Sequence, residues 1–171
     1  RRVLFRSPIG LREYVNELIH SLDCAIDPKK RVSILGEIGV HLRSLENLDE
    51  AKRHLTEALK IINDNHLGIQ WEIQQKIRLA HVFQWQKNFE KSDSLFAEII
   101  DACRTNSDAS VYLDFALQHA GKNLFDQKKF KEALKMFEET LTLRQNRNAP
   151  QDQIESTEMA IARTKSLLKG A

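Results

Sequence analysis

The strongest constraint on the fold is an internal repeat with an interval of 41 residues. Three segments align, and they read NLDEAKRHLTEAL, NFEKSDSLFAEII and KFKEALKMFEETL. Six columns of apolar or small residues keep this offset, namely Ile38/Leu79/Ala120, Gly39/Ala80/Gly121, Leu42/Phe83/Leu124, Leu48/Phe89/Phe130, Ala51/Ser92/Ala133 and Leu55/Phe96/Phe137. An interval of this length indicates stacked copies of one supersecondary unit, because a single copy cannot bury its own apolar stripe.

Each copy has the pattern of two helices joined by a short turn. The chain has only three prolines and six glycines, and residues that favour helices fill the segments between them. Small residues on both helices of a copy allow the two backbones to approach closely, and large apolar residues interdigitate around that contact. The columns therefore predict a structural core at Gly39, Leu42, Ala51, Leu55, Ala80, Phe83, Phe96, Gly121, Leu124, Ala133 and Phe137.

This pattern resembles the tetratricopeptide repeat. The matching features are a large apolar residue (Leu35, Leu117) three positions before an apolar–small pair, followed by the small and large residues of the second helix. The middle copy departs from the family pattern at Lys76 and Ser92, and the interval exceeds the usual 34 residues. The chain is similar in this respect to the long-period repeats of kinesin light chains and bacterial regulators. The resemblance implies an all-α fold, a right-handed α-solenoid of antiparallel hairpins with about eight helices.

The repeat register divides the chain into segments. Residues 8–31 are expected to hold the second helix of a truncated preceding repeat and a linker, in which Asp27 and Pro28 begin the next helix. Asn47 is expected to cap the second helix of the first full repeat. The predicted repeats cover 32–72, 73–113 and 114–154, and residues 155–171 form a capping helix with Ile154, Ile161, Ala162 and Leu168 directed at the last hairpin.

The first seven residues, RRVLFRS, do not continue any helical pattern of the chain. They correspond to a reading frame through a common sequencing-library adapter. We therefore expect 1–7 to be a non-native tail on a truncated gene fragment, with at least one helix missing upstream of Pro8. The alternative is a polybasic arm or targeting peptide, although its two short basic clusters are sparse for such a motif.

Charge and composition limit the classes of protein to which the chain could belong. The 26 basic and 24 acidic side chains are interspersed and leave a formal net charge of +2, so no concentrated basic surplus predicts direct nucleic-acid binding. No apolar run is long enough to predict a membrane span. Cys24 and Cys103 are far apart and belong to no CxxC pair, which favours two reduced thiols in a cytoplasmic protein.

The sequence offers no recognisable catalytic or cofactor motif. It contains no GxxxxGK[ST], GxGxxG, HExxH or GxSxG, and its six histidines lack metal-ligand spacing. The expectation is therefore a protein that is not an enzyme and needs no cofactor or metal. Trp71 and Trp85 are interpreted as packing residues rather than a base-stacking platform, because no basic surplus accompanies them.

Two hypotheses for the function remain open. The first is a scaffold that binds a protein or peptide segment, possessing acidic residues, in a concave groove lined by one stripe of each first helix. The second is a peptide-sensing regulatory domain of a larger bacterial transcription regulator or signalling protein, whose output domain lies outside this sequence. A merely solvated face is the alternative for the groove itself. Its predicted lining is Glu37, Gln74, Arg78, His81, Trp85, Phe115, His119, Lys122 and Arg163.

Overall fold

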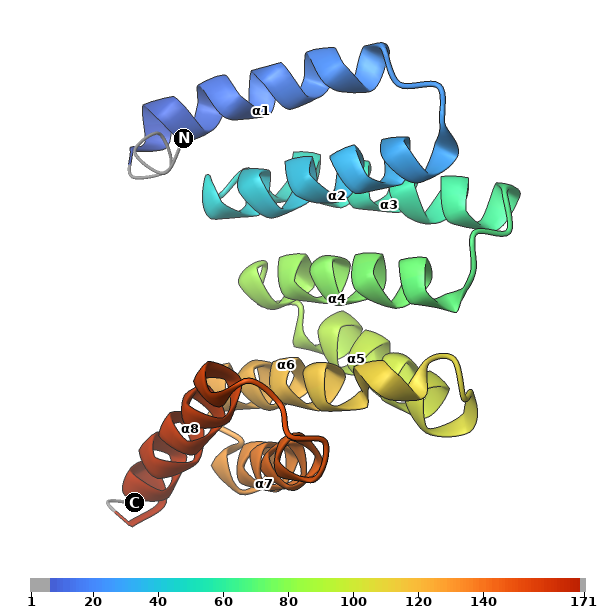
Figure 1. Ribbon diagram of the computed structural model, residues 1–171. Coiled ribbons are helices and arrows are strands. Elements are labelled where there is room, and N and C mark those ends of the chain that lie inside the picture. The colour runs from blue at the N-terminus through green and yellow to red at the C-terminus, as the bar shows by residue number, and fades with distance from the viewer. Residues whose placement is uncertain (1–6, 170–171) are drawn as a thin grey trace. The chain divides into compact units, whose positions relative to one another are not determined.

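The part of the chain that this computed structural model describes, residues 7–169, forms eight α-helices and no strand. The chain divides into two compact units, residues 1–88 and 89–171. The N-terminal unit holds α1 (Pro8–Asp23), α2 (Pro28–Ser44), α3 (Leu48–Asp64) and α4 (Ile69–Trp85). The C-terminal unit holds α5 (Phe89–Thr105), the 3-10 helix η2 (Ser110–Tyr112), α6 (Leu113–Asp126), α7 (Phe130–Asn146) and α8 (Gln151–Lys169), coloured from yellow-green to red in Figure 1.

Sequential helices are neighbours within each unit. In the N-terminal unit α2 packs against α1, α3 and α4, so that it occupies a central position. In the C-terminal unit α6 packs against α5 and α7, and α7 packs against α8. Within each unit, helices that follow one another along the chain form hairpins through short turns (Figure 1), as the repeated helix–turn–helix pattern predicts.

The second helices of the three aligned segments begin at equivalent residues. These helices are α3, α5 and α7, which start at Leu48, Phe89 and Phe130 and are each 17 residues long. The first helices α2 and α4 also have 17 residues each, whereas α6 has 14 because the 3-10 helix η2 precedes it. The segments 63–68, 104–110 and 144–151 each contain a helix end followed by a turn.

Five helix ends share one turn geometry in which a residue other than glycine adopts a left-handed conformation. These residues are Glu46, His66, Lys87, Lys128 and Asn148, with φ between 51° and 62°. After α6, the Lys128 N–H donates to the Phe125 carbonyl and the Lys129 N–H donates to the Leu124 carbonyl. This pair of bonds is a Schellman motif, which satisfies helix-terminal carbonyls that would otherwise lack partners.

Lys128→Gly should stabilise the protein. A residue with a Cβ atom costs roughly 1–2 kcal/mol when it adopts the left-handed conformation, and glycine avoids this cost. The greater conformational freedom of glycine in the unfolded chain cancels part of the resulting increase in stability. We expect a net increase of about 0.5–1 kcal/mol in the free energy of unfolding, measured by chemical denaturation. Lys128→Ala removes the same charge but keeps Cβ, so it should change little, and equal stability of the two variants would contradict the explanation.

Close approach of the hairpin helices depends on two glycines. A Cβ added to Gly39 on α2 would lie 2.6 Å from Leu55 Cγ on α3. In the C-terminal unit a Cβ on Gly121 of α6 would lie 2.5 Å from Phe137 Cε1 on α7. Each glycine therefore lies directly beneath the large apolar residue of the next helix, which is the small-against-large packing that the columns predicted.

Most of the predicted core positions are inaccessible to solvent. Ala51, Leu55, Ala80 and Ala133 are fully buried, and Phe137 is 1% exposed. Gly39, Leu42, Phe96 and Gly121 are also buried. Two positions differ, because Phe83 and Leu124 near the ends of α4 and α6 are only half-buried.

The departure from the family pattern at Ser92 has a structural reason. Ser92 is fully buried on α5, and its hydroxyl donates to Asn123 Oδ1 on α6 at 2.8 Å. The Asn123 amide donates in turn to Asp93, which also accepts hydrogen bonds from Gln127 and Lys129. A hydroxyl replaces the methyl group of alanine here because α6 presents a buried amide that needs a partner. The other departure, Lys76, forms an ion pair with Glu72 one turn away on α4.

A buried polar network connects the last three helices. Arg144 on α7 donates from Nε to Asp114 Oδ2 on α6 at 2.9 Å and from Nη1 to Thr157 Oγ1 on α8 at 2.6 Å. Its Nη1 also donates to the Gln153 carbonyl at 2.9 Å, and Thr157 donates to Gln118 Oε1 at 3.2 Å. Asp114, Gln118, Arg144 and Thr157 are all buried. Polar atoms thus hold α8 in place alongside the apolar cluster of Ala133, Phe137 and Ile161.

The helix starts agree only partly with the expected capping residues. Asp27 accepts a hydrogen bond from the Lys30 N–H at 2.7 Å, with Pro28 in the first turn of α2, as predicted. Asn47 occupies the N-cap position of α3 without a side-chain cap bond, because its ψ of 71° departs from the extended conformation that directs a capping side chain at the first turn. Ser7 caps α1 through the Gly10 N–H, whereas the rest of the predicted tail, 1–6, lies outside the described residues.

The buried stripe of α8 differs from the predicted one. Thr157, Ile161 and Thr164 are buried, whereas Ile154 and Leu168 are half-buried and Ala162 is exposed. The buried threonines occupy this face because the helix meets a polar network as well as an apolar cluster. Thr157 bonds within that network, and Thr164 donates to the Ala160 carbonyl of its own helix.

Candidate functional site

Arg78 on α4 is a half-buried charged residue of the N-terminal unit. A Cβ added to Gly36 of α2 would overlap sterically with Arg78 Nη1, so the guanidinium lies directly over this glycine. Arg78 Nη1 also donates to Gln75 Oε1 at 3.1 Å, and the Gln75 side chain is 1% exposed. The glycine and the buried amide thus fix the position of the guanidinium between α2 and α4.

A second arginine lies close to the first. Arg43 on α2 places its guanidinium carbon 5.4 Å from the centroid of the Trp85 ring, a cation–π contact between the ends of α2 and α4. The indole is 43% exposed, so the Arg43–Trp85 pair is accessible to a ligand. We call Arg43 and Arg78, together with Gly36, Gln75 and Trp85, the arginine site.

The two guanidiniums lie in a desolvated environment. Burial lowers the pKa of Arg43, and repulsion from Arg78 lowers it further. Burial also lowers the pKa of Arg78, whereas the nearby Glu37 carboxylate opposes that change. Both side chains are half-buried, and among the described residues neither has a carboxylate within ion-pair distance. Cations that lose solvent without gaining an anionic partner are unfavourable, and they are a common feature of binding sites.

Glu37 is held by a residue of the preceding helix. The Tyr14 hydroxyl on α1 donates to Glu37 Oε2 at 3.2 Å, and the Tyr14 ring meets the His41 ring edge-on with centroids 5.4 Å apart. Burial lowers the pKa of His41, with Glu37 raising it and Arg78 lowering it to smaller extents. The face formed by α1, α2 and α4 therefore carries two arginines, one carboxylate and a histidine that favours its neutral form.

The other predicted groove residues of the N-terminal unit differ in exposure. His81 is half-buried, and its Nδ1 lies 2.8 Å from Gln84 Oε1 of the same helix. Gln74, one turn before Arg78, is exposed. Within this unit the structure therefore places Arg78 near Glu37 and Trp85 against Arg43, and His81 approaches Gln84 of its own helix.

In the C-terminal unit the predicted groove residues lie on α6 and α8. Phe115 is 45% exposed, and its ring meets that of His119 edge-on with centroids 4.3 Å apart. Partial desolvation lowers the pKa of Lys122, and repulsion from Arg144 lowers it further to a smaller extent. The guanidinium carbon of Arg163 on α8 lies 5.2 Å from the centroid of the Phe125 ring. This unit thus presents aromatic and cationic side chains on α6 and α8.

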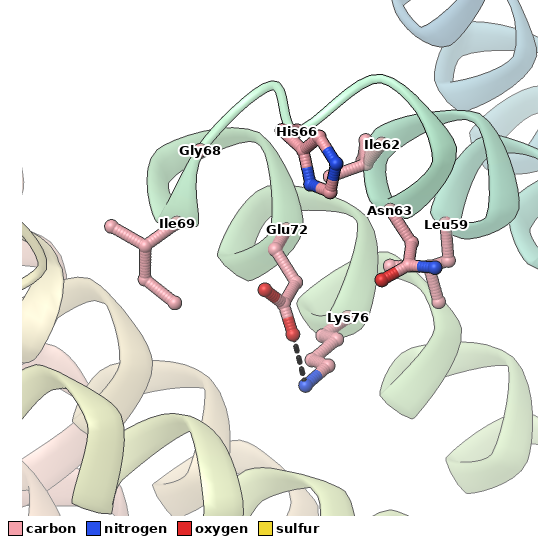
Figure 2. A pocket seen from close by; sticks show the side chains of 8 residues that line it. All are labelled: Leu59, Ile62, Asn63, His66, Gly68, Ile69, Glu72 and Lys76. Carbon is pink, nitrogen blue, oxygen red and sulfur yellow. Dashed lines mark ion pairs between the residues drawn. The ribbon is translucent and has the colours of Figure 1, made fainter.

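The hollow drawn in Figure 2 lies away from the arginine site. The hollow lies beside the α3–α4 turn and has a volume of about 390 Å³. Glu72 and Lys76, which form an ion pair, are both part of its lining (Figure 2). The rest of the wall consists of three apolar residues of α3 and α4, the polar Asn63 of α3, and His66 and Gly68 of the turn (Figure 2). Because its charged groups already neutralise one another, this hollow gives no indication of a ligand.

Three observations bear on other chemistry. Over residues 7–169 no group of three or more His, Cys, Asp or Glu side chains is arranged to hold a metal ion. Within the same range no helix is both long and apolar enough to cross a membrane. Burial raises the pKa of the Cys103 thiol, which favours the unreactive protonated form.

Sequence reasoning missed Tyr14, Gly36 and Arg43 as parts of this face. Arg43 lies outside the repeat columns, and its side chain reaches Trp85 only because an arginine is long. Gly36 was a recognisable signal, since a glycine inside a helix is unfavourable unless another group occupies its space. Its occupant could be found only from the structure.

The comparisons with known proteins agree with this fold. Residues 73–146 match the family model described as Tetratricopeptide repeat. The structure resembles the crystal structure of BtubC (BKLC) from P. vanneervenii, with a TM-score of 0.68, 18% sequence identity, and coverage of 97% of this chain and 77% of that chain. No curated protein matches the sequence significantly.

A second solved structure is also similar. It is a Podosopora anserina protein described as a kinesin light chain with nearly identical TPR-like repeats, with a TM-score of 0.67 and 11% identity. The alignment covers 96% of this chain and 83% of that chain. The fold is thus an all-α solenoid of the tetratricopeptide-repeat type, and the match over 73–146 supports that family. Proteins of this class generally serve as protein-interaction scaffolds.

Proposed function

We propose that this chain binds an acidic peptide segment through the first helices of its repeats. The observation that carries the proposal is the arginine site, in which two half-buried guanidiniums lack an anionic partner among the described residues. An acidic segment would supply charge-assisted hydrogen bonds to these donors. The C-terminal unit contributes His119, Lys122 and Arg163, which favour the same class of ligand.

The repeat organisation underlying this proposal is a 41-residue unit. The starts of α3, α5 and α7 support it, as do the left-handed residues Glu46, Lys87 and Lys128 that precede the second helices. With this unit the repeats cover 32–72, 73–113 and 114–154. Arg78 and Lys122 then lie on the first helices of consecutive repeats, and each is a cationic donor within its own unit.

A charge-reversal experiment tests the binding of acidic segments. Arg78→Glu combined with Lys122→Glu should weaken binding of an acidic peptide by at least about tenfold, because each reversal replaces an attraction with a repulsion. The measurement is fluorescence anisotropy with labelled peptides of equal length in acidic, neutral and basic versions. Binding of the acidic peptide to the unmodified protein should also weaken as the salt concentration rises.

A matched control carries the same change in net charge on exposed helix faces. Lys60 on α3 and Lys131 on α7 are exposed, and Lys60→Glu with Lys131→Glu should leave peptide binding unchanged. Circular dichroism should show equal helicity for both double variants. If the two double variants bind the acidic peptide equally, or if no peptide version binds to the unmodified protein, the proposal is wrong.

The regulatory-domain hypothesis and a cytoplasmic location stay predictions. A regulator would use the same peptide-binding face, but an output domain in the same open reading frame would respond to it. The intact reading frame distinguishes the two hypotheses, since a helix-turn-helix or kinase segment joined to these repeats would favour the regulator.

A further inference from the structure

The arginine site contains more positive donors than a single carboxylate can satisfy. Each guanidinium presents its N–H groups as a planar fork that matches two oxygens of an anion. Arg78 uses one nitrogen for Gln75, and Arg43 lies over the Trp85 ring, which leaves donors on both groups without an anionic partner. A carboxylate has two oxygens and can fill one fork, whereas a phosphoryl group has three terminal oxygens and can bridge two.

The residues around the two arginines fix the position of Arg78 and provide a further hydrogen-bond donor for an anion. Arg78 is seated over Gly36, where any side chain would displace its guanidinium. The Gln75 side chain is 1% exposed, and its Nε2 has no hydrogen-bond partner among the described residues, so this side of the site is rich in donors. The neighbouring carboxylate of Glu37 already accepts a hydrogen bond from Tyr14.

We propose that the arginine site binds a phosphorylated side chain of the partner segment, with Arg43 and Arg78 on two of its faces. The proposal rests on the proposed function, since it names the group in the bound segment that this site recognises. A phosphorylated side chain carries nearly two negative charges and only acceptor oxygens at its terminus. These properties match two mutually repelling cations that have lost part of their solvent.

The test uses four labelled peptides that differ at one position or pair of positions. The variable position holds serine, glutamate, phosphoserine or a glutamate pair, within the same acidic segment. Trp71→Phe leaves Trp85 as the only tryptophan, so its fluorescence reports on the Arg43–Trp85 contact while anisotropy reports on affinity. The phosphoserine peptide should bind at least about tenfold more tightly than the glutamate peptide, and it should change the Trp85 emission.

Two variants separate the roles of charge and position. Arg78→Lys keeps the charge but loses the fork, and it should bring the affinities of the phosphoserine and glutamate peptides close together. Gly36→Ala changes no charge and favours the helix, yet it should reduce the phosphoserine preference because Arg78 must move from its seat. Lys60→Gln, on an exposed face of α3, should keep the full preference.

Each outcome decides between the proposals. Equal affinity of the phosphoserine and glutamate peptides, or tighter binding of the glutamate pair, would overturn the phosphoryl inference while the acidic-segment proposal stands. Failure of all four peptides would overturn both. Inorganic phosphate serves as a competitor, and displacement of the peptide at equal concentration would show that the site takes a free phosphoryl anion instead of a modified segment.

Discussion

Replacing Phe137 by alanine is expected to lower the free energy of unfolding by about 3–5 kcal/mol. The Phe137 side chain is 1% exposed and lies over Gly121, with Ala133 and Ile161 in the same cluster. Because Gly121 has no side chain that could move into the space, truncation leaves a cavity between α6 and α7. Chemical denaturation followed by circular dichroism measures the loss.

Lys135→Ala on the same helix provides the control for Phe137. Lys135 is exposed, so its replacement should change the free energy of unfolding by no more than about 0.5 kcal/mol. Small and equal losses for the two variants would mean that the repeat register does not identify the residues that hold the hairpin together.

Arg144→Met should cost a comparable amount, about 3–5 kcal/mol, for an electrostatic reason. The substitution keeps most of the apolar stem but leaves the buried Asp114 carboxylate, the Gln153 carbonyl and Thr157 without their shared donor. Arg144 and Asp114 side chains are only 6% and 4% exposed, so water cannot replace the lost hydrogen bonds without opening the structure.

Arg147→Met removes the second, more exposed guanidinium that contacts the Asp114 carboxylate. The Arg147 guanidinium lies 2.8 Å from Asp114 Oδ2, but its side chain is 44% exposed. Solvent therefore screens the interaction, and the loss should stay below about 1 kcal/mol. If the two methionine variants are equally stable, burial is not what makes the Arg144 network important.

The sequence predicted much of the fold because the same packing requirement recurs in the first and third aligned segments. Gly39 and Gly121 are small where Leu55 and Phe137 are large, so a fixed interval reveals the pairing without a structure. The half-buried position of Leu124 was missed because α6 buries the amide of its neighbour Asn123 instead, for the hydrogen bond with Ser92. A polar pair of this kind leaves no trace in a pattern of apolar residues.

The candidate site was less predictable. The repeat offset indicated that Arg78 and Trp85 share one stripe of α4, and the structure places Arg78 near Glu37 and Trp85 against Arg43. The repeat offset could not show that Arg43 and Tyr14 belong to the site, because long side chains reach neighbours that their Cα positions do not suggest. Nor could it reveal which charged residues lack partners, since that depends on the rotamer that each side chain adopts.

The position of Arg78 over Gly36 couples the effects of substitutions on two different helices, α2 and α4. In the binding of acidic segments that we propose, a substitution at Gly36 would alter recognition through Arg78 without itself contacting the ligand, and a later change at position 78 would then have a smaller effect than in the original background. This is epistasis with a steric origin. Diversification of ligand preference in such repeats can therefore begin at a glycine that a survey of charged surface residues would overlook.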